Sequence, residues 1–414
     1  MIILINQVRL MVIIIGGGAS GLIAAVAAGN AAGGDNVKII EKNERIGRKL
    51  LATGNGRCNL TNINAASDSY RGEQPGFCAS ALRMFSAEHT IEFFNRLGLV
   101  VRTETDGRVY PKCDSAGAVL DVLRNEIARL NIEIIHADVS RLSFNRDAFL
   151  IHCTDNRNIT GLSVIVSTGG RAAPVFGSNG SGYNLLTQMG HELNKVYPAL
   201  VQLRTSFADI KSLNGVRVNA GIGLRKNGRV IGYQEGGLQF TNYGVSGIPA
   251  LNISGAAEQG SDIVIDFSPD TDSDALLRLL VKRAANLSAL SAEEFLTGFF
   301  HKAVGRLLLK YAGIPPKPPV SAMTWHLNKL AGVIKSFCMP FSGVLGFEEA
   351  QVTGGGIRTS EFNPYTMESV IRKGLFAAGE VLDIYGPCGG YNLQWAWASG
   401  YLAGISAARY RNAL

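Results

Sequence analysis

Three glycines near the N-terminus have the spacing of a turn that binds phosphate. Gly16, Gly18 and Gly21 follow an apolar run, and Ala19 and Ser20 stand where a helix would open. The first glycine permits a sharp bend, the second lets a pyrophosphate approach the backbone, and the third lets the helix pack closely on its strand. Unpaired N–H groups at the start of that helix attract phosphate oxygens. The pattern predicts a dinucleotide site, and a purely structural glycine turn is the alternative.

A carboxylate follows the glycine turn at the spacing typical of dinucleotide-binding proteins, since Glu41 is 20 residues after Gly21. Glu41 ends the next apolar run and Lys42 follows it. A carboxylate in this place accepts hydrogen bonds from ribose hydroxyls. The loop from 47 to 62 then interleaves glycines with basic and amide side chains, which suits it to wrap a polar, partly anionic ligand. Its candidate cofactor-binding residues are Arg48, Lys49, Gly56, Arg57 and Asn59. A solvated basic loop is the alternative interpretation.

The elements that must position these residues form a strand–turn–helix–strand unit. The patterns predict a buried strand over 9–15, an alanine-rich helix over 19–32 and a second strand over 37–41. This is the length of a right-handed βαβ crossover. Further helices are expected over 86–97 and 115–130, and further strands over 132–136 and 162–167. The first part of the chain therefore reads as an α/β domain.

Residues beyond 200 change in character. Alternating patterns predict strands over 200–207, 216–224 and 229–233, with Asn227-Gly228 as a hairpin turn, and a further strand over 263–267. Residues 273–311 and 321–337 look helical, and paired prolines separate them. In the second helix, one face would carry Leu327, Leu330, Ile334 and Phe337. We expect an α/β domain interrupted by an insertion that is partly β-rich and partly helical.

The composition fits this chemistry and excludes other classes of protein. The chain has 414 residues, of which 46% are hydrophobic and 49 are glycine. Such a chain can bury a large core, which excludes wholesale disorder, and no apolar run is long enough to span a bilayer. The first seven residues carry no leading positive charge, which disfavours a signal peptide. The six cysteines have neither CxxC nor metal-ligand spacing, so we expect reduced thiols, no metal and a cytoplasmic protein.

Several motifs together resemble those of a bacterial family of NAD(P)/FAD-dependent oxidoreductases. The resemblance covers nearly the whole chain in order, and its most specific parts are Arg57-Cys58-Asn59 and Gly390-Tyr391-Asn392. The other matching segments are 47–62, 107–111, 353–357, 366–369, 379–383 and 389–396. Members of this family include aminoacetone oxidase, a bile-acid-pathway flavoprotein and a flavoenzyme that reduces a uridine in ribosomal RNA.

The resemblance implies a discontinuous, glutathione-reductase-type FAD-binding domain that is Rossmann-like, with an inserted β-barrel-like part and a helical part. Residues 1–190 and 345–414 would form the FAD-binding domain. Residues 191–272 and 338–344 would form the β-rich insertion, and residues 273–337 the helical one.

The resemblance also implies where the cofactor lies. FAD would extend from a pyrophosphate at Gly16 to Gly21 and a ribose at Glu41 to an isoalloxazine beside the turn from Gly389 to Leu393. By analogy, the adenine would meet backbone near Val139. The remaining expected cofactor contacts are Thr168, Gly169, Gly170, Gly379, Glu380, Asp383, Gly390, Tyr391, Asn392 and Leu393. Backbone N–H groups in the last turn could stabilise negative charge at N1–C2=O of a reduced flavin.

The sequence departs from the family at one position that bears on catalysis. Relatives commonly carry histidine in the segment 240–244, where this chain has Asn242. An amide does not titrate in the useful range, so Asn242 cannot replace a proton-transferring histidine. No catalytic acid or base is therefore assigned. No second G-x-G-x-x-G follows a strand, so NAD(P)H is expected only as a transient electron donor.

Three functions remain open at this stage. The leading one is an FAD-dependent oxidoreductase that acts on an unidentified small molecule, with the oligomeric state left open. The second is reduction of a uridine in ribosomal RNA, since residues 273–338 carry nine basic and three acidic side chains that could attract RNA. Solvated helical lysines explain the same charge without a partner. The third is a binding module in which FAD is only structural.

Overall fold

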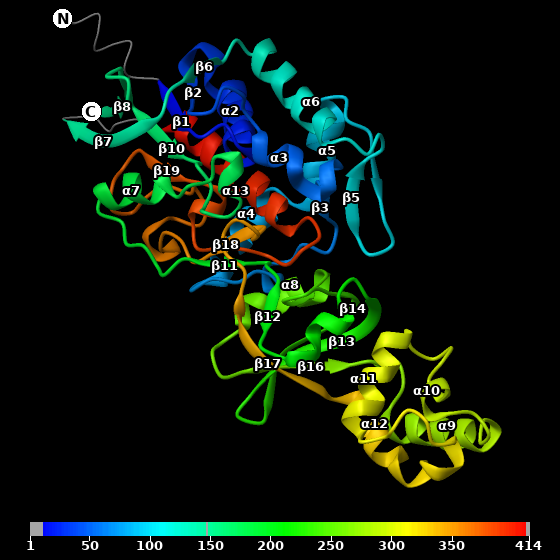
Figure 1. Cartoon of the computed structure of the whole chain (residues 1–414). Coiled ribbons are helices and arrows are strands. Elements are labelled where there is room, and N and C mark those ends of the chain that lie inside the picture. Colours follow the sequence, from blue (N-terminus) through cyan, green and yellow to red (C-terminus); the bar gives the residue numbers. More distant parts are fainter. Residues whose placement is uncertain (1–10, 146–147, 411–414) are drawn as a thin grey trace, which may run out of the picture. The chain divides into compact units, whose positions relative to one another are not determined.

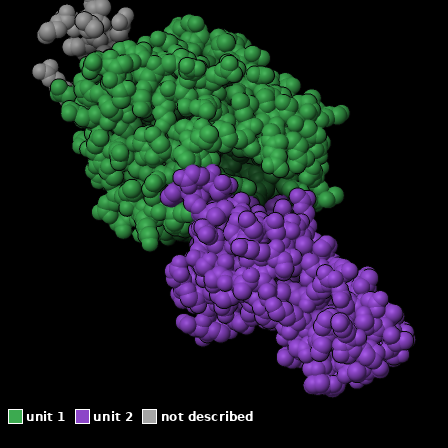
Figure 2. Space-filling model, in the orientation of Figure 1, with its two compact units in different colours: residues 1–198, 351–414 green, residues 199–350 purple. Residues whose placement is uncertain are grey.

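The computed structural model describes residues 11–145 and 148–410. The predictions about the N-terminal segment, including the first two residues of the strand expected over 9–15, lie outside the described residues. The chain divides into two compact units, residues 1–198 with 351–414 and residues 199–350 (Figure 2). The first unit is discontinuous in sequence. The finer three-part division made above stays a prediction.

A five-stranded parallel sheet forms the centre of the first unit (Figure 1). Its strands, in spatial order, are β19 (Leu375–Ala377), β10 (Ser163–Val166), β1 (Val12–Ile15), β2 (Val37–Glu41) and β6 (Glu133–His136). All four residues of β1 and of β10 are buried, as expected for parallel strands that are covered on both faces. The parallel sheet and the helices around it confirm the expected α/β class.

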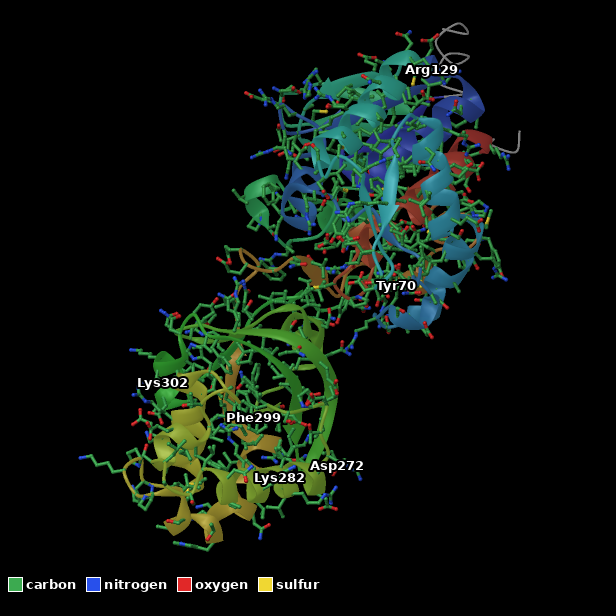
Figure 3. The ribbon with its side chains drawn as sticks, turned by 90° about the vertical axis from the view of Figure 1, so that its right-hand side faces the viewer. Tyr70, Arg129, Asp272, Lys282, Phe299 and Lys302 are labelled. Carbon is green, nitrogen blue, oxygen red and sulfur yellow. The ribbon has the colours of Figure 1, made fainter. Side chains whose placement is uncertain are left out.

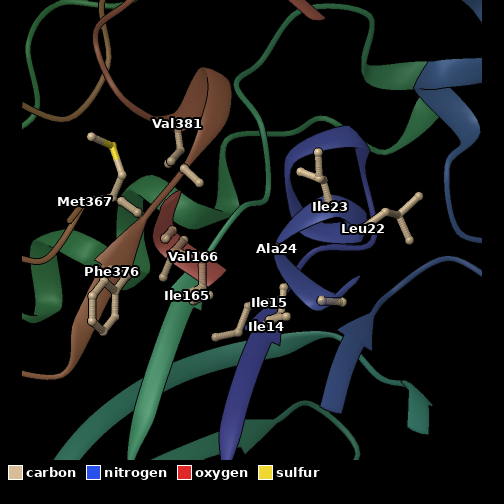
Figure 4. Packing of buried hydrophobic residues seen from close by; sticks show 14 of the residues in the cluster. Ile14, Ile15, Leu22, Ile23, Ala24, Ile165, Val166, Met367, Phe376 and Val381 are labelled. Carbon is tan, nitrogen blue, oxygen red and sulfur yellow. The ribbon is translucent and has the colours of Figure 1, made fainter. Parts of the chain in front are cut away.

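Helix α2 (Ala19–Ala32) covers this sheet and is itself covered by helix α13 (Tyr391–Arg409). Ile14 and Ile15 of β1 pack near Leu22, Ile23 and Ala24 of α2 (Figure 4). The alanines of α2 keep its surface flat enough for a second helix to approach it closely.

Glycines in α13 make that close approach possible. A Cβ at Gly400 would lie 2.3 Å from the Ser20 carbonyl oxygen, and one at Gly404 would lie 2.3 Å from the Ala24 carbonyl oxygen. Residue numbers increase together along both helices, from Gly400 against Ser20 to Gly404 against Ala24, so the two helices run in the same direction. Helix α13 was not expected from the sequence, because nearly every face of it is buried and it lacks an amphipathic stripe.

Smaller elements surround this core. An antiparallel sheet contains β3 (Thr61–Asn62), β5 (Arg108–Pro111) and β4 (Val101–Thr103). Another contains β7 (Val139–Asn145), β8 (Ala148–Cys153) and β9 (Asn158–Gly161), and β11 (Tyr197–Ala199) pairs with β18 (Val352–Gly354). The other helices of this unit are α3 (Arg48–Ala52), α4 (Cys78–Met84), α5 (Ala87–Arg96), α6 (Ala116–Arg129) and α7 (Ser181–Gln188). Helices α5 and α6 lie within the ranges expected for them.

The second unit contains a closed six-stranded barrel and a group of helices. The barrel strands, in spatial order, are β12 (Leu203–Thr205), β15 (Gly244–Ser246), β14 (Arg229–Phe240), β13 (Arg217–Lys226), β16 (Asp262–Asp266) and β17 (Phe337–Val344). The predicted hairpin turn is confirmed: Lys226 pairs with Arg229, and Asn227 and Gly228 adopt positive φ. The helices are α8 (Ile248–Ile253), α9 (Ser273–Asn286), α10 (Ala292–Phe295), α11 (Lys302–Ala312) and α12 (Leu327–Lys335).

Several predicted elements of the second unit are wrong in extent, and the strand expected over 229–233 continues to Phe240. The helix expected over 273–311 is divided into α9, α10 and α11. The helix expected over 321–337 begins only at Leu327, and Phe337 opens a barrel strand that pairs with Ile265. The strand expected over 200–207 is confined to Leu203–Thr205. Periodicity identified which side chains are buried, but not where the backbone changes conformation.

Among the residues described, no helix has both the length and the apolar character needed to cross a bilayer. All six cysteines are free thiols.

A buried glutamine joins α13 to three other segments. The Gln394 Oε1 accepts hydrogen bonds from the hydroxyls of Thr61 (2.6 Å) and Thr90 (2.9 Å), and its Nε2 donates to the Phe85 carbonyl (2.7 Å). Gln394, Thr61 and Thr90 are fully buried. This network fixes the first turn of α13 against β3 and α5.

Replacing Gln394 by leucine should therefore destabilise the protein strongly. Two buried hydroxyls and one carbonyl lose their partners, which we expect to cost about 3 kcal/mol or more. Urea unfolding measures the difference. The matched control is Gln74→Leu at an exposed position, which should shift the midpoint little. Equal midpoints for the two variants would contradict the importance of the network.

Candidate functional site

The glycine turn between β1 and α2 has the geometry that the spacing predicts. Gly16 has a φ of 107°, in the left-handed region. A Cβ at Gly21 would lie 1.9 Å from the Gly16 carbonyl oxygen, so helix and turn could not pack with any larger residue. In front of Gly18, by contrast, no atom lies within 4 Å of where a Cβ would stand. The turn thus presents bare backbone and the N-terminus of α2 to open space.

Glu41 is buried beside this turn. Its Oε2 accepts a hydrogen bond from the Gly17 N–H (2.7 Å), and its Oε1 accepts from the backbone and side-chain N–H groups of Asn43 (2.8 and 2.6 Å). A carboxylate has about four acceptor sites, so Oε2 retains capacity for a further donor such as a ribose hydroxyl. Lys42 follows half-buried, and the Ala137 N–H bonds the Glu41 carbonyl, which brings the start of β7 at Val139 close to the same corner.

The loop from 47 to 62 begins at the glycine turn, where the Gly47 N–H bonds the Gly17 carbonyl (2.8 Å). Within this loop Gly54, Asn55, Gly56 and Cys58 all have positive φ. Such a run of left-handed residues turns backbone N–H groups to one side, as in anion-binding concavities. Between α3 and β3 the loop is therefore built from unusual backbone rather than from a regular element.

The basic side chains of the loop have different partners. The Arg48 guanidinium donates to the Asn43 side chain and the Val175 carbonyl, each at 3.1 Å. Lys49 forms an ion pair with Glu380 (2.8 Å). Arg57 stacks over the Tyr110 ring at 4.6 Å and has no carboxylate within ion-pair distance among the described residues. Arg57 is thus a fixed, uncompensated cation.

The end of β10 meets β18 and the segment after β19. The Ser167 hydroxyl donates to the Ile15 and Gly16 carbonyls, each at 3.0 Å. Gly169 has positive φ, and a Cβ at Gly170 would lie 2.3 Å from the Thr353 hydroxyl and 2.8 Å from the Glu380 carboxylate. The Thr168 hydroxyl is buried without a hydrogen-bond partner in the described part of the chain. Strands far apart in sequence therefore converge beside the glycine turn.

The segment from Gly379 to Asp383 divides between two places. Gly379 lies against α2, where a Cβ would be 2.6 Å from the Ser20 hydroxyl, and Glu380 accepts from the Thr353 N–H (2.8 Å). The Asp383 carboxylate instead accepts from the Asn194 side chain (2.9 Å) and the Glu73 N–H (3.1 Å). Glu380 and Asp383 are thus not brought to one point.

The C-terminal turn is bound to the same loop. Gly389 and Gly390 have φ values of 114° and 99° and directly precede α13. The Asn62 side chain donates to the Gly389 carbonyl (2.9 Å), and the Asn59 amide oxygen accepts from the Gly390 N–H (3.1 Å) in the amide orientation that also lets its nitrogen donate to the Thr61 carbonyl. The loop 47–62 therefore runs from the dinucleotide turn to the C-terminal turn.

One expectation about this turn is corrected. Residues 389–393 were expected to form a turn as a whole, but Tyr391, Asn392 and Leu393 are the first residues of helix α13. Asn392 clamps the preceding loop: its Oδ1 accepts from the Gly386 N–H (2.8 Å) and its Nδ2 donates to the Gly386 carbonyl (2.9 Å). Tyr391 accepts a hydrogen bond from the Tyr70 hydroxyl at its carbonyl (2.8 Å).

The two glycine turns are related through their helices. Gly400 contacts Ser20 and the helices run in the same direction, so Tyr391 lies nine residues before the level of Ser20. Helix α2 begins at Ala19, one residue before that level, so at 1.5 Å per residue the N-terminus of α13 lies about 12 Å before that of α2 along the shared helix direction. Two helix N-termini, each opened by glycines, therefore point the same way at different depths.

Thiol chemistry is not favoured at either turn. Burial raises the pKa of the Cys58 and Cys388 thiols to about 12 each. Both thiols therefore stay protonated near neutral pH, whereas the thiolate is the reactive form.

A buried serine–histidine–glutamate arrangement supports the fold. The His191 Nδ1 lies 2.9 Å from the Glu361 carboxylate and its Nε2 lies 2.9 Å from the Ser369 hydroxyl. Ser369 is fully buried, and its oxygen also accepts from the N–H groups of Ile371 and Arg372. With these lone pairs engaged and no exposure, Ser369 is not a nucleophile. The motif at 366–369 is thus structural.

The sequence predicted the glycines of the site but missed several of their partners. Asn43 gave no signal, and Thr353 and Gln394 lay in segments that resemble the family but received no role, because each acts through a contact with a residue distant in sequence or in a loop. Only the density of polar side chains after glycine-rich runs could have indicated them.

Comparison with known proteins agrees with this geometry. The family model of the HI0933-like protein Rossmann domain matches residues 10–406. The chain is 39% identical to the 3-dehydro-bile acid delta(4,6)-reductase of Clostridium scindens, with 91% of this chain and 93% of that protein covered. It is 30% identical to the ribosomal RNA dihydrouridine synthase of Escherichia coli, with 89% and 91% covered.

Among solved structures, 3-ketosteroid delta1-dehydrogenase from Sterolibacterium denitrificans is similar with a TM-score of 0.49 and 13% identity, over 96% of this chain and 99% of that one. The resemblance drawn from the sequence motifs is confirmed by the family match. The chain therefore belongs to the HI0933-like Rossmann family of FAD-dependent oxidoreductase-like proteins.

Proposed function

We propose that this protein binds FAD and reduces a carbon–carbon double bond conjugated to a carbonyl group in a small molecule. One observation carries the cofactor assignment. Two helix N-termini, each preceded by glycines, point the same way about 12 Å apart along the helix direction and are joined by the loop 47–62. FAD in an extended conformation would need two such backbone sites, one for its pyrophosphate and one for its isoalloxazine, at different positions along the helix direction.

The residues present fit FAD. The open space before Gly18 admits a pyrophosphate, and the N–H groups at the start of α2 would bind it. Glu41 would accept from the adenosine ribose, with Val139 nearby, and Gly389, where a Cβ would have no atom closer than 3.7 Å, would let the isoalloxazine approach the turn before α13. A bound flavin supplies hydride transfer to or from a substrate. We assign the other residues of the sequence prediction to this site on the same argument.

The protein's own groups would orient the cofactor and stabilise charge. The N-terminus of α13 carries a partial positive charge that favours an anion. Arg57, which is without a carboxylate partner among the described residues, adds a full positive charge held in place by Tyr110. The Lys49–Glu380 ion pair fixes the backbone where β18 meets the end of β10. These groups bind and orient, and none of them is required to transfer a proton.

The names of the relatives support the type of reaction. Delta(4,6) bile-acid reduction and dihydrouridine formation both saturate a double bond that is conjugated to a carbonyl. The higher identity to the bile-acid reductase favours a steroid-like small molecule over an RNA base. We take NADPH or NADH as the electron donor.

The structure leaves fewer basic side chains free to contact RNA than the sequence alone suggested. Several basic side chains between 273 and 338 have partners within their own unit: Arg283 with the carbonyls of Phe295 and Thr297, Arg306 with Glu293, Lys310 with Asp209, and Lys335 with Asp266. Lys282 and Lys302, on the helices of that unit (Figure 3), have no ion-pair partner among the residues described.

The first functional prediction concerns the reaction. The purified protein should be yellow and release FAD on denaturation, and anaerobic NADPH or NADH should bleach its flavin absorbance. A 3-oxo-Δ4 steroid should then restore the absorbance, whereas a uridine-containing ribosomal RNA fragment should do so far more slowly. Stopped-flow spectroscopy measures both steps. A colourless protein would exclude FAD binding, and a flavin that neither donor reduces would favour the non-catalytic binding module.

The second prediction separates cofactor binding from folding. Gly18→Ala places a Cβ in space that the protein leaves open, at a φ of −83° that alanine adopts freely. We expect an unchanged melting temperature without cofactor, but FAD affinity reduced at least about tenfold because the Cβ opposes the pyrophosphate. Gly332→Ala is the matched control, since it also has open space at its Cβ and lies in the other unit. Full FAD content in Gly18→Ala would contradict the assigned pyrophosphate site.

The third prediction tests the RNA alternative without disturbing the fold. Lys282→Ala and Lys302→Ala together should leave binding of ribosomal RNA fragments unchanged if the substrate is a small molecule. A large loss of RNA binding at low salt, with FAD content intact, would favour RNA because phosphate contacts release counterions. Electrophoretic mobility shifts at several salt concentrations decide between the two.

A further inference from the structure

Two tyrosine hydroxyls meet close to the C-terminal turn. The Tyr197 and Tyr385 hydroxyl oxygens are 3.4 Å apart, and the two rings pack edge to face with their centroids 6.4 Å apart. Neither residue has a role in the binding argument above. A hydroxyl pair beside a candidate flavin site is a possible source of protons for chemistry there.

Backbone contacts hold both rings in place. Tyr197 packs against β18, where a Cβ at Gly354 would lie 2.4 Å from Tyr197 Cε2. Tyr385 exchanges two backbone hydrogen bonds with Arg71, of 3.0 and 2.8 Å. The glycine motif at 353–357 thus leaves the space that the Tyr197 ring occupies.

The pair is also tied to α13. Gly386, which follows Tyr385, is held by both polar atoms of the Asn392 side chain. Asn392 belongs to the first turn of α13, where the proposed function puts the isoalloxazine. The Tyr385 backbone is therefore fixed relative to that turn.

The two tyrosines differ in exposure and so in role. Tyr385 is buried, with 4% of its surface exposed, whereas Tyr197 is half-buried. Burial, the neighbouring Tyr197 and Asp383 all raise the pKa of Tyr385, and Arg71 lowers it less. Tyr385 thus keeps its proton near neutral pH and can donate a hydrogen bond, while Tyr197 is the one of the two with solvent-exposed surface.

We propose that Tyr197 is the catalytic proton donor of the reduction and that Tyr385 is its positioning residue; this rests on the proposed function. A bound reduced flavin would supply the hydride, with its electron pair, for the new C–H bond at the β carbon of the conjugated double bond. The π electrons of that bond take the proton of Tyr197 at the α carbon, and the Tyr197 O–H bond breaks. The Tyr197 oxygen, left negative, accepts a hydrogen bond from Tyr385 and regains its proton from water.

This role supplies the acid that the sequence lacks at Asn242. It uses no group of the cofactor-binding set, because Tyr197 and Tyr385 contact neither the glycine turn nor Glu41 in the contacts described. Phenol hydroxyls act as general acids in enzymes, and such catalysis contributes typically about 10²–10⁴-fold to rate.

The test separates the two half-reactions in the flavin-loaded protein. In Tyr197→Phe, reduction of the flavin by NADPH should stay within about twofold of wild type, while re-oxidation by a 3-oxo-Δ4 steroid should slow about 100-fold. Tyr385→Phe should slow re-oxidation less, by about tenfold. Tyr401→Phe is the control, a tyrosine of α13 whose ring stacks on Phe85, and it should change neither step. A merely structural role would slow both steps or neither.

A second measurement is independent of turnover. Carbon-13 NMR of ring-labelled tyrosine follows the ionisation of Tyr385, identified by its absence in Tyr385→Phe. Because Tyr197 raises the pKa of Tyr385, the ionisation of Tyr385 should move to lower pH in Tyr197→Phe. An unchanged titration would show that the two hydroxyls do not interact and would overturn the positioning role.

The outcomes distinguish this inference from the function on which it rests. An active wild type with an equally fast Tyr197→Phe overturns the proton donor and leaves the proposed function standing. A wild type that transfers hydride to no conjugated carbonyl compound overturns both.

Discussion

The approach of helix α13 to helix α2 is the contact on which the rest of the first unit depends. It exists only because no side chain stands at Gly400 or Gly404, where a Cβ would meet the carbonyls of α2. These close contacts fix the position of α13 along the axis of α2. A shift of α13 by one residue would place a larger side chain against the Ser20 and Ala24 carbonyls. The position of the Gly389–Gly390 turn follows from that register.

Local patterns predicted the parts of the fold that local interactions determine. The helix over 19–32 and the strand over 37–41 agree with the structure to the residue, because Gly18 precedes the helix and Gly33, with positive φ, ends it. The hairpin at Asn227-Gly228 succeeds for the same reason. Helix α13 was missed because burial on nearly all sides removes the periodicity by which helices are recognised. Phe337 fits the apolar face of a helix, yet barrel pairing places it in a strand.

The candidate site was predictable only in half. The spacing of Gly16, Gly18 and Gly21 is characteristic of a phosphate-binding turn, so their roles could be predicted from the sequence. Their partners could not, because Lys49 meets Glu380 and Asn59 meets Gly390 across more than three hundred residues of chain. Polar contacts between such distant segments leave no pattern in one sequence, and only the folded backbone brings them together.

The split of the first unit between the two ends of the chain has a consequence for how the protein forms during synthesis. Strand β19 and helix α13 emerge from the ribosome last, after the whole of residues 199–350. Until then β10 has an unpaired edge, and the alanine face of α2 has no cover. The inserted unit, residues 199–350, is continuous in sequence and can fold while the apolar surface of α2 is still exposed. The first unit is therefore completed late, when β19 and α13 pair with segments from the start of the chain. We expect the nascent chain to be most prone to aggregation just before its last forty residues are synthesised.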